Sequence, residues 1–251
     1  MRVVVTGGGT IAPIDDVRHV ANASTGRFSA AISEAWLERG ADVWHVHAPS
    51  AERPIRRHLG RLDLDADPAE IRRRLDEVTL RWRAHRDRLH LVPLPRGDVR
   101  DYATALAQAL RPRPTPADVV MLAMAASDFE PEPTPGKLSS DADELLIRCR
   151  RAPKVIQSVR DWAPDAYLVG FKLLSGATEA ELIRAAEEAC HVNRADLTVA
   201  NDLRHYRAGR HTIHLVRPGH PVETYCSAEG DLAARLVDRI LDWTDRSGSG
   251  I

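Results

Sequence analysis

The sequence predicts an α/β fold: a Rossmann-like, doubly wound and mostly parallel sheet with an inserted helical segment and a C-terminal hairpin. Short apolar runs alternate with segments of helical periodicity, and the first run, residues 2–6, ends in three consecutive glycines. Hydrophobic residues make up 43% of the 251 residues, which is enough for a sizeable core. We expect one domain over residues 1–251, with an insertion at 49–88 and a frayed tail at 246–251.

The charge and the cysteines exclude several classes of protein. With 35 basic and 36 acidic residues, the formal net charge is −1, which argues against binding to nucleic acid or to a membrane surface. Cys149, Cys190 and Cys226 lie far apart without CxxC spacing, so neither a disulfide framework nor a zinc site is indicated. The N-terminal apolar run is too short for a signal peptide, and no window has the length of a membrane span. We therefore expect a soluble protein of the reducing cytoplasm.

The N-terminal half predicts strands and helices in alternation. The first helix begins after Ser24 or Thr25, either of which can cap it, and Gly40 ends it. Within the insertion, apolar residues recur every three or four positions over 68–88, which predicts an amphipathic helix lying over the domain. Asp98 can cap the next helix. The strands of this half are predicted at 2–6, 42–48 and 89–94, and its last helix at 99–110.

The C-terminal half continues this alternation. The run 118–126 is the most apolar of the chain and predicts a central buried strand. A capping box of Thr178 and Glu181 predicts the start of a helix that reaches Asn193. Two runs around the sequence RPGHP predict a hairpin. Further strands are predicted at 145–149, 167–172, 197–200, 212–216 and 222–225, and further helices at 153–162 and 232–243.

The glycine turn at Gly7, Gly8 and Gly9 allows the backbone to approach a phosphate, and the N-terminus of the following helix favours an anion. A tight turn without a ligand is the weaker alternative, because three glycines lose conformational entropy with no evident packing return. Two features argue against a dinucleotide site. The glycine spacing is not GxGxxG leading directly into a helix, and the second strand ends in HVH rather than in an acid that could bind a ribose hydroxyl. No Gly-Lys-Ser/Thr follows, so the turn is not a P-loop.

A long polar loop, residues 10–25, separates the glycine turn from the first helix. We interpret it as the active-site loop of a nucleotide-using enzyme. The sequences TGGG, AASDF, GFK and AND each follow or end a predicted strand. Ligands of open α/β sheets bind at the carboxyl ends of the strands, so we expect these segments to face one crevice. The polar residues of the loop are Asp15, Arg18, Asn22, Ser24 and Thr25.

Five motifs in this order resemble those of the phosphopantothenate–cysteine ligase family: VTGGGTIAPIDDVRHVANASTG, AASDFEPEPTPGK, RAPK, GFK and VAND. The resemblance covers residues 1–48 and 118–204, and it is closer to the stand-alone members than to the fused bacterial ones. It implies a ligase of coenzyme A biosynthesis that activates phosphopantothenate as an acyl-nucleotidylate and then joins it to cysteine. It also implies CTP or ATP as co-substrate, Mg²⁺, a homodimer, and the decarboxylase of the pathway as a separate protein.

The resemblance implies a role for each matching residue. Asn22 is expected to donate its amide to the acyl-nucleotidylate, Arg18 to bind a substrate phosphate or carboxylate, and Lys137 to clamp the nucleotide from a flexible loop. These three are the expected catalytic residues, and we assign no side chain as a ligand of the magnesium ion. The expected nucleotide-binding residues are Gly7, Gly8, Gly9, Ser24, Thr25, Gly26, Ala126, Asp128, Phe171, Lys172, Asn201 and Asp202.

Structural alternatives stay open for these residues. Asn22 is also suited to an Asx turn, and Lys137 to a solvated surface. Phe171 is suited to the core as well as to stacking on a base, and Asp202 to capping a helix or binding an ion. Where the family commonly has a lysine after Ser-Thr-Gly, this chain has Arg27, which leaves the choice of nucleotide open.

Three other functions remain as alternatives. A short-chain NAD(P)-dependent oxidoreductase needs a Tyr-x-x-x-Lys pair, and none of the four tyrosines is followed by lysine at that spacing. The flavin-dependent decarboxylase of the same pathway does not carry the ligase motifs, which begin here at residue 3. A non-catalytic nucleotide-binding relative is disfavoured by the presence of Asn22 and Lys137.

Overall fold

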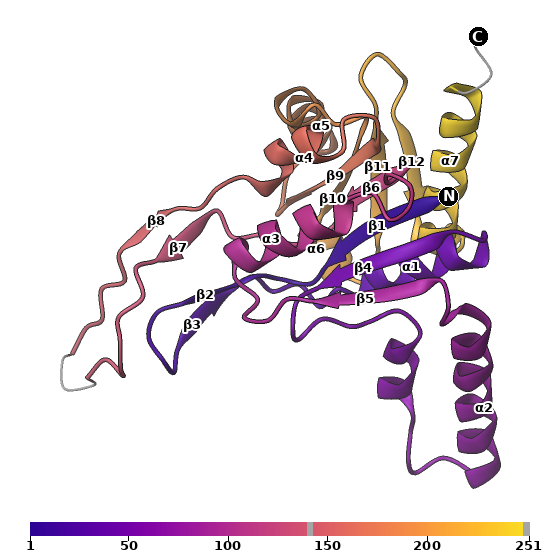
Figure 1. Ribbon diagram of the computed structural model, residues 1–251, viewed down its shortest axis with the longest axis horizontal. Helices are drawn as coiled ribbons and strands as arrows, with labels where there is room; N and C mark the ends of the chain where they lie inside the picture. Colours follow the sequence, from indigo (N-terminus) through magenta and orange to yellow (C-terminus); the bar gives the residue numbers. More distant parts are fainter. Residues whose placement is uncertain (140–142, 248–251) are drawn as a thin grey trace.

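The computed structural model describes residues 1–139 and 143–247, and its centre is an eight-stranded sheet (Figure 1). The strand order is β5-β4-β1-β6-β9-β10-β11-β12. Strands β5 to β10 in this order run parallel, and β11 is antiparallel to both of its neighbours, which confirms the predicted sheet and C-terminal hairpin. The strands are β1 (Arg2–Gly7), β4 (Asp42–His47), β5 (Leu89–Pro93), β6 (Val119–Leu122), β9 (Tyr167–Leu174), β10 (Leu197–Asp202), β11 (Thr212–Val216) and β12 (Glu223–Cys226).

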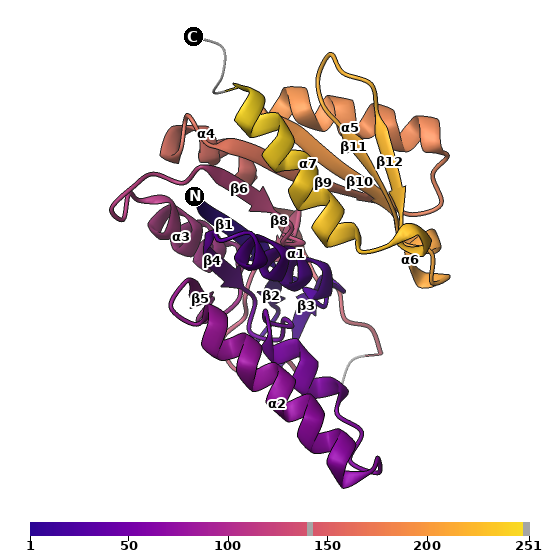
Figure 2. The ribbon, with the colours of Figure 1, turned by 90° about the vertical axis from the view of Figure 1, so that its right-hand side faces the viewer.

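Helices cover both faces of the sheet, as a doubly wound fold requires. The alternation of side chains along β1 places Val3 and Val5 in the core beneath α1 and α7, while Val4 lies in the core beneath α3 and α4. Figure 2 shows α1 and α7 side by side on one face. The helices are α1 (Arg27–Glu38), α2 (Pro68–His85), α3 (Val99–Leu110), α4 (Val159–Trp162), α5 (Glu179–Asn193), α6 (Leu203–Arg207) and α7 (Leu232–Ser247).

Two of the three predicted helix caps are confirmed. Asp98 accepts the N–H of Asp101 at the start of α3, and Thr178 and Glu181 form the capping box of α5. At the start of α1 the N-cap is Gly26 instead of the predicted Ser24 or Thr25, although the Thr25 hydroxyl accepts the N–H of Arg27, the first residue of the helix. Gly26 has φ 72, and a Cβ there would lie 3.0 Å from the Ala51 side chain, so this position needs glycine.

The inserted helix α2 covers the domain only in part, with its half-buried Val78 and Trp82 packed against the core. It projects away from the sheet (Figure 1), and it contains no buried residue. Leu75 is 40% exposed and Leu80 is 70% exposed. Salt bridges join Arg73 to Glu70 and Glu77 along the helix, and such pairs support a solvated helix that has few apolar contacts.

Two antiparallel ribbons, which the sequence did not predict, extend beyond the carboxyl edge of the sheet. The first, β2 (Ile11–Pro13) with β3 (His19–Ala21), occupies the predicted active-site loop. The second joins β7 (Phe129–Pro131) to β8 (Cys149–Arg151). Figure 1 shows the two ribbons side by side, where β2 contacts β7.

Several predicted boundaries are wrong. The strand expected at 145–149 begins only at Cys149, and the helix expected at 153–162 is a 3₁₀ turn, η2 (Val155–Ser158), followed by α4. The strand expected at 118–126 ends at Leu122. The closing helix continues to Ser247, so only residues 248–251 of the predicted tail lie outside the described residues. Within the described part of the chain, no helix is long and apolar enough to cross a membrane.

Candidate active site

The glycine turn that follows β1 is packed tightly against its own protein. A Cβ at Gly7 would lie 1.9 Å from the Ser29 hydroxyl oxygen, and one at Gly9 would lie 2.2 Å from the backbone oxygen of Asn22. Gly8 has φ +94, in the left-handed region, and a Cβ there would lie 2.7 Å from the Ala51 side chain. The expectation that these glycines bring no packing return is therefore wrong. The fold itself requires them, whether or not they also approach a ligand.

The backbone of Ala125 brings two of the predicted motifs together. Its N–H donates to the oxygen of Gly8 at 2.9 Å, and its oxygen accepts the N–H of Thr10 at 3.1 Å. The same oxygen accepts Nδ2 of Asn22 at 2.9 Å. Asn22 is exposed to solvent, so this bond fixes an amide at the open edge of the sheet, between the ends of β1 and β6.

Arg18 is held by a buried acid on the same ribbon. Its Nε and Nη2 donate to Oδ2 of Asp15 at 3.0 and 2.6 Å, and Oδ1 of Asp15 accepts the N–H groups of Val17 and Arg18. The Asp15 side chain has no exposed surface. Hydrogen bonds from the Arg18 side chain keep the pKa of Asp15 far below its ordinary value, despite burial. The carboxylate of Asp15 is therefore ionised at neutral pH.

The loop that carries Lys137 is docked onto the β2–β3 ribbon. Leu138 donates its N–H to Oδ2 of Asp15 at 3.1 Å, and its oxygen accepts Nη2 of Arg18 at 2.8 Å. On the other side of Lys137, the oxygen of Gly136 accepts the N–H of Asp16 at 3.0 Å. Lys137 itself is exposed. The structure thus brings Lys137 to the ribbon that carries Arg18 and Asn22.

Asp128 forms an ion pair with Lys154 just beyond the end of β6. Both side chains are more than half exposed, so solvent screens this pair. Ala126, two residues before Asp128, is half-buried and donates its N–H to the oxygen of Met124. Sequence reasoning did not name Lys154 as a site residue, although the RAPK motif that contains it was part of the family resemblance. It adds a cation to this edge of the sheet.

An aromatic row connects the middle of β9 with the first turn of α1. Phe171 meets Phe28 edge to face at 6.4 Å between ring centroids, and Phe28 meets His211 at 4.7 Å. Phe171 is half-buried, which suits both of its alternatives, a core contact and a surface for a base. Lys172 is also half-buried. Burial lowers the pKa of His211, so this ring is neutral at pH 7.

Asp202 and Asn201 end β10 with different surroundings. Asp202 is buried, and its carboxylate accepts the N–H groups of Gly176, Ala177, Arg204 and His205, thereby capping α6. Burial opposes its ionisation, but these four donors hold the pKa of Asp202 below its ordinary value. The capping alternative for Asp202 is therefore confirmed. Asn201 is half-buried.

The start of α1 lies directly against the glycine turn. The site of a Cβ on Gly26 is 3.2 Å from the nitrogen of Gly8, and Ser24 donates its N–H to the oxygen of Asn22 at 2.8 Å. Thr25 is exposed and accepts the N–H of Arg27 on its hydroxyl at 3.3 Å. The N-terminus of this helix therefore faces the same edge as the predicted site, and its dipole favours an anion there.

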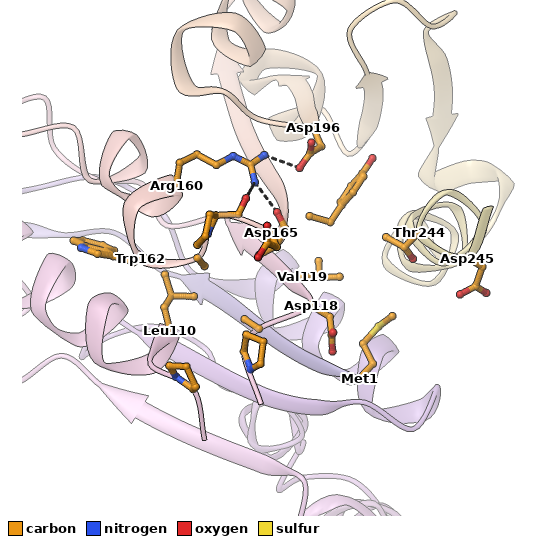
Figure 3. Close-up of a pocket in the computed structure, with 17 residues that line it drawn as sticks. Met1, Leu110, Asp118, Val119, Arg160, Trp162, Asp165, Asp196, Thr244 and Asp245 are labelled. Atoms are coloured by element: carbon orange, nitrogen blue, oxygen red, sulfur yellow. Dashed lines mark hydrogen bonds and ion pairs between the residues drawn. The ribbon is translucent and has the colours of Figure 1, made fainter. Parts of the chain in front are cut away.

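A cavity of about 770 Å³ lies at the opposite edge of the sheet (Figure 3). Asp118 and Tyr167, at the amino ends of β6 and β9, line it, and Arg160 donates to Asp196 across its wall at 2.8 Å. Ligands of open α/β sheets bind at the carboxyl ends of the strands. We therefore place the candidate site at the carboxyl edge and not in this cavity.

Among residues 1–139 and 143–247, no group of three or more His, Cys, Asp and Glu side chains is arranged to hold a metal ion. Magnesium in nucleotide enzymes is commonly held by one or two carboxylates and the substrate phosphates. Asp128 is the exposed carboxylate among the predicted nucleotide-binding residues. The donor set fits an ion that is held mainly by the triphosphate.

The family model described as the DNA/pantothenate metabolism flavoprotein C-terminal domain matches residues 1–64 and 97–243. The chain belongs to this family. The residues between the matched segments contain α2. The bifunctional coenzyme A biosynthesis protein CoaBC of Thermococcus kodakarensis is 28% identical over 239 residues, with 95% of this chain and 50% of that protein covered. The chain therefore spans about half the length of this relative.

Other similar proteins agree with this assignment. The human phosphopantothenate–cysteine ligase is 31% identical over 237 residues, covering 80% of this chain and 72% of the human one. A Cab2 variant in complex with phosphopantothenate-cysteine shares the fold with a TM-score of 0.81 at 21% identity, covering 98% of this chain and 86% of that one. The DNA/pantothenate metabolism flavoprotein of Streptococcus pneumoniae superposes with a TM-score of 0.75 at 24% identity, covering 97% of this chain and 99% of that one. The resemblance to the ligase family is confirmed.

Proposed function

We propose that this chain is a phosphopantothenate–cysteine ligase of coenzyme A biosynthesis, using CTP or ATP. The observation that carries the proposal is the backbone of Ala125, which joins the glycine turn to the amide of Asn22. This contact supports a site in which phosphate-binding and acyl-binding groups share one edge of the sheet. Membership of the family and the similarity to the human ligase support the same reaction.

In the first step, a carboxylate oxygen of phosphopantothenate attacks the α-phosphorus of the nucleotide, and pyrophosphate leaves. Two anions must approach each other, so the protein has to supply positive charge at the phosphates. Lys137, Lys172 and the N-terminus of α1 are the groups that we assign to this task. Mg²⁺, when bound to the triphosphate, would further neutralise its charge.

In the second step, the amine of cysteine attacks the acyl carbon. A C–N bond forms, and the C–O bond between the acyl carbon and the bridging oxygen breaks. The nucleoside monophosphate leaves with the bridging oxygen. One proton of the attacking amine passes to solvent, and the other stays on the nitrogen of the amide. We assign Asn22 to the acyl oxygen, because its amide is exposed and its direction is fixed by Ala125.

We assign two roles to Arg18, one in binding substrate and one in holding the loop that carries Lys137. Its Nε and Nη2 bind Asp15 and Leu138, which leaves Nη1 as the edge that would meet a substrate phosphate or carboxylate. The ion pair restricts the guanidinium to one orientation, and a preoriented donor loses less entropy on binding. Arg18 would therefore bind substrate and also hold the Lys137 loop in place.

The remaining parts of the proposal concern the whole protein. We propose a homodimer in the cytoplasm, with CTP or ATP as co-substrate and the decarboxylase of the pathway on a separate chain. The aromatic row at Phe171 and Phe28 supports a site for a base, and both cytosine and adenine present a face for stacking.

The reaction is tested with phosphopantothenate, cysteine, Mg²⁺ and either CTP or ATP. Pyrophosphate and the nucleoside monophosphate are measured with and without cysteine. We expect product whose formation depends on cysteine, with one nucleotide preferred. No such product with either nucleotide would refute the ligase.

The three alternative functions are distinguished from the ligase by different observations. A non-catalytic relative would bind nucleotide and release no pyrophosphate. An NAD(P)-dependent oxidoreductase is disfavoured because the β2–β3 ribbon separates the glycine turn from α1, so the turn does not lead directly into a helix. A purified protein without flavin absorbance would argue against the decarboxylase.

A further inference from the structure

A small basic pocket lies beside the start of α1, outside the residues assigned above. Its volume is about 220 Å³. It is formed by the first turn of α1 and by the segment that leads into η1 (Arg56–Arg61). Four arginines and one glutamate line it, so its wall carries a net positive charge. The lining residues are Arg27, Ala51, Glu52, Arg53, Arg56, Arg57 and Gly60.

The arginine-bearing segment is fixed by a buried acid of α1. Glu34 accepts the N–H of Ile55 at 2.7 Å and two guanidinium nitrogens of Arg57 at 2.8 and 3.0 Å. Burial opposes the ionisation of Glu34, but these donors hold its pKa below the ordinary value. The segment is therefore anchored through a charged group and does not depend on loop packing alone.

Ile55 has a backbone conformation that is rare for its type. It is 2% exposed and has φ 64, in a region that a β-branched residue seldom adopts. Such strain persists only where the surroundings enforce it, and it is common at ligand sites. Here the turn at Ile55 lets Arg53 and Arg56, on either side of it, line the same pocket.

The arginines of the pocket differ in whether they are already paired with a carboxylate. Arg57 is paired with Glu34, and Arg27 lies 3.2 Å from Glu52. The guanidinium of Arg56 lies 5.3 Å from the Trp82 ring centre, and stacking leaves the N–H edge of an arginine available. Arg53 is exposed, and none of the ion pairs found in the described residues involves it. Arg53 and Arg56 are therefore the cations available to a ligand.

The pocket adjoins the predicted phosphate site. Glu52 donates its N–H to the oxygen of Thr25 at 2.8 Å, and the Ala51 side chain lies against Gly8 and Gly26. Burial lowers the pKa of His47, at the end of β4, and the charges of Arg53 and Arg56 lower it further. The field of these two arginines therefore reaches the carboxyl edge of the sheet.

We propose that this pocket is a second anion subsite, in which Arg53 and Arg56 bind a phosphate group of a ligand seated on the glycine turn. The planar fork of arginine matches the oxygens of a phosphate, and the pocket has room for one such group. The substrate assignment rests on the proposed ligase function. Its phosphate belongs either to the nucleotide or to the phosphomonoester of phosphopantothenate.

The binding test uses pyrophosphate and inorganic phosphate as probes, with titration calorimetry at fixed ionic strength. Arg53→Gln is compared with wild type and with Arg72→Gln, which removes an exposed arginine of α2. We expect about tenfold weaker pyrophosphate binding in Arg53→Gln, the loss typical of one charged hydrogen-bonding partner. Unchanged affinity in Arg53→Gln, or an equal loss in Arg72→Gln, would overturn the subsite.

Steady-state kinetics then identify the source of the phosphate. A raised KM for the nucleotide alone supports the triphosphate, and a raised KM for phosphopantothenate alone supports the phosphomonoester. Arg53→Lys should recover part of the affinity, because it restores charge without the fork. If wild type binds pyrophosphate through Arg53 but forms no amide product, the ligase function fails while the subsite stands.

Discussion

Asp15 and Arg18 form an ion pair that also fastens the loop carrying Lys137. The carboxylate of Asp15 accepts from the guanidinium of Arg18 and from the backbone of Leu138, and Arg18 donates to the oxygen of Leu138. Asp15 thus connects the β2–β3 ribbon to the loop between β7 and β8. The arrangement makes the position of Lys137 depend on Asp15.

We expect Asp15→Asn to raise the KM for the nucleotide more than it lowers kcat. The neutral amide cannot pair with Arg18, so the loop loses a charge-assisted contact, and about tenfold in KM is the expected scale. Initial rates at varied nucleotide and saturating phosphopantothenate measure this. An equal fall of kcat at unchanged KM would show that Asp15 does not act through the Lys137 loop.

Lys137→Ala should reduce kcat/KM for the nucleotide by about a hundredfold, because a cation that meets the developing phosphate charge is lost. Arg72→Ala, which removes an exposed cation from α2, is the matched control and should leave the rate unchanged. Equal rates for Lys137→Ala and wild type would place this lysine outside the reaction.

Asn22→Ala should lower amide formation by about a hundredfold, the usual loss for one donor to an oxyanion. The first step does not need this amide, so acyl-nucleotidylate should accumulate. Single-turnover quenching, with chromatographic detection of the intermediate, measures both species. Normal turnover in this variant would refute the role of Asn22.

Gly9→Ala should destabilise the fold by about 1–3 kcal/mol, because overpacking forces a backbone shift. The added Cβ would lie 2.2 Å from the backbone oxygen of Asn22. Urea unfolding measures the change, with Gly60→Ala as control, since a Cβ at Gly60 meets nothing within 4 Å. If both variants unfold at the same urea concentration, the close approach at Gly9 has no energetic importance.

The buried histidine His45 should make the fold sensitive to acid. Burial, with a smaller contribution from His47, lowers the pKa of His45 from 6.5 to about 3. Between these values the unfolded chain binds a proton that the folded chain does not, so the free energy of unfolding falls as pH falls below 6.5. His45→Gln does not titrate. The stability difference between wild type and His45→Gln should therefore shift against wild type on acidification, and a pH-independent difference would contradict this.

The mostly parallel sheet and the gathering of strand ends at one edge could be predicted because they depend on patterns within short segments. Apolar runs and helical periodicity identify strands and helices locally, and the carboxyl-edge rule then places TGGG, AASDF, GFK and AND together. The contact of Ala125 with Gly8 confirms this for the first two segments. The caps at Asp98 and Thr178 were predictable for the same reason.

The two ribbons and the contact between Asp15 and Leu138 that joins them were not predictable. Each ribbon strand has three residues, too few to show an alternating pattern. Asp15 and Leu138 are 123 residues apart, so nothing local to either residue indicates their contact. The basic pocket was missed because Arg53, Arg56 and Arg57 belong to a segment that was interpreted only as an insertion. Glycine sequences likewise do not reveal which atoms a Cβ would meet.

The central place of β1 affects how the chain can fold while it is being synthesised. One edge of β1 can pair as soon as residues 42–47 have emerged, but its other edge must wait for β6 at residues 119–122. During that interval Val3, Val4 and Val5 present an open strand edge, which favours pairing with other chains and so invites aggregation or chaperone binding. Gly8 acquires its bond to Ala125 later still. A ribosome-bound chain thus completes its glycine turn only after Ala125 has been made.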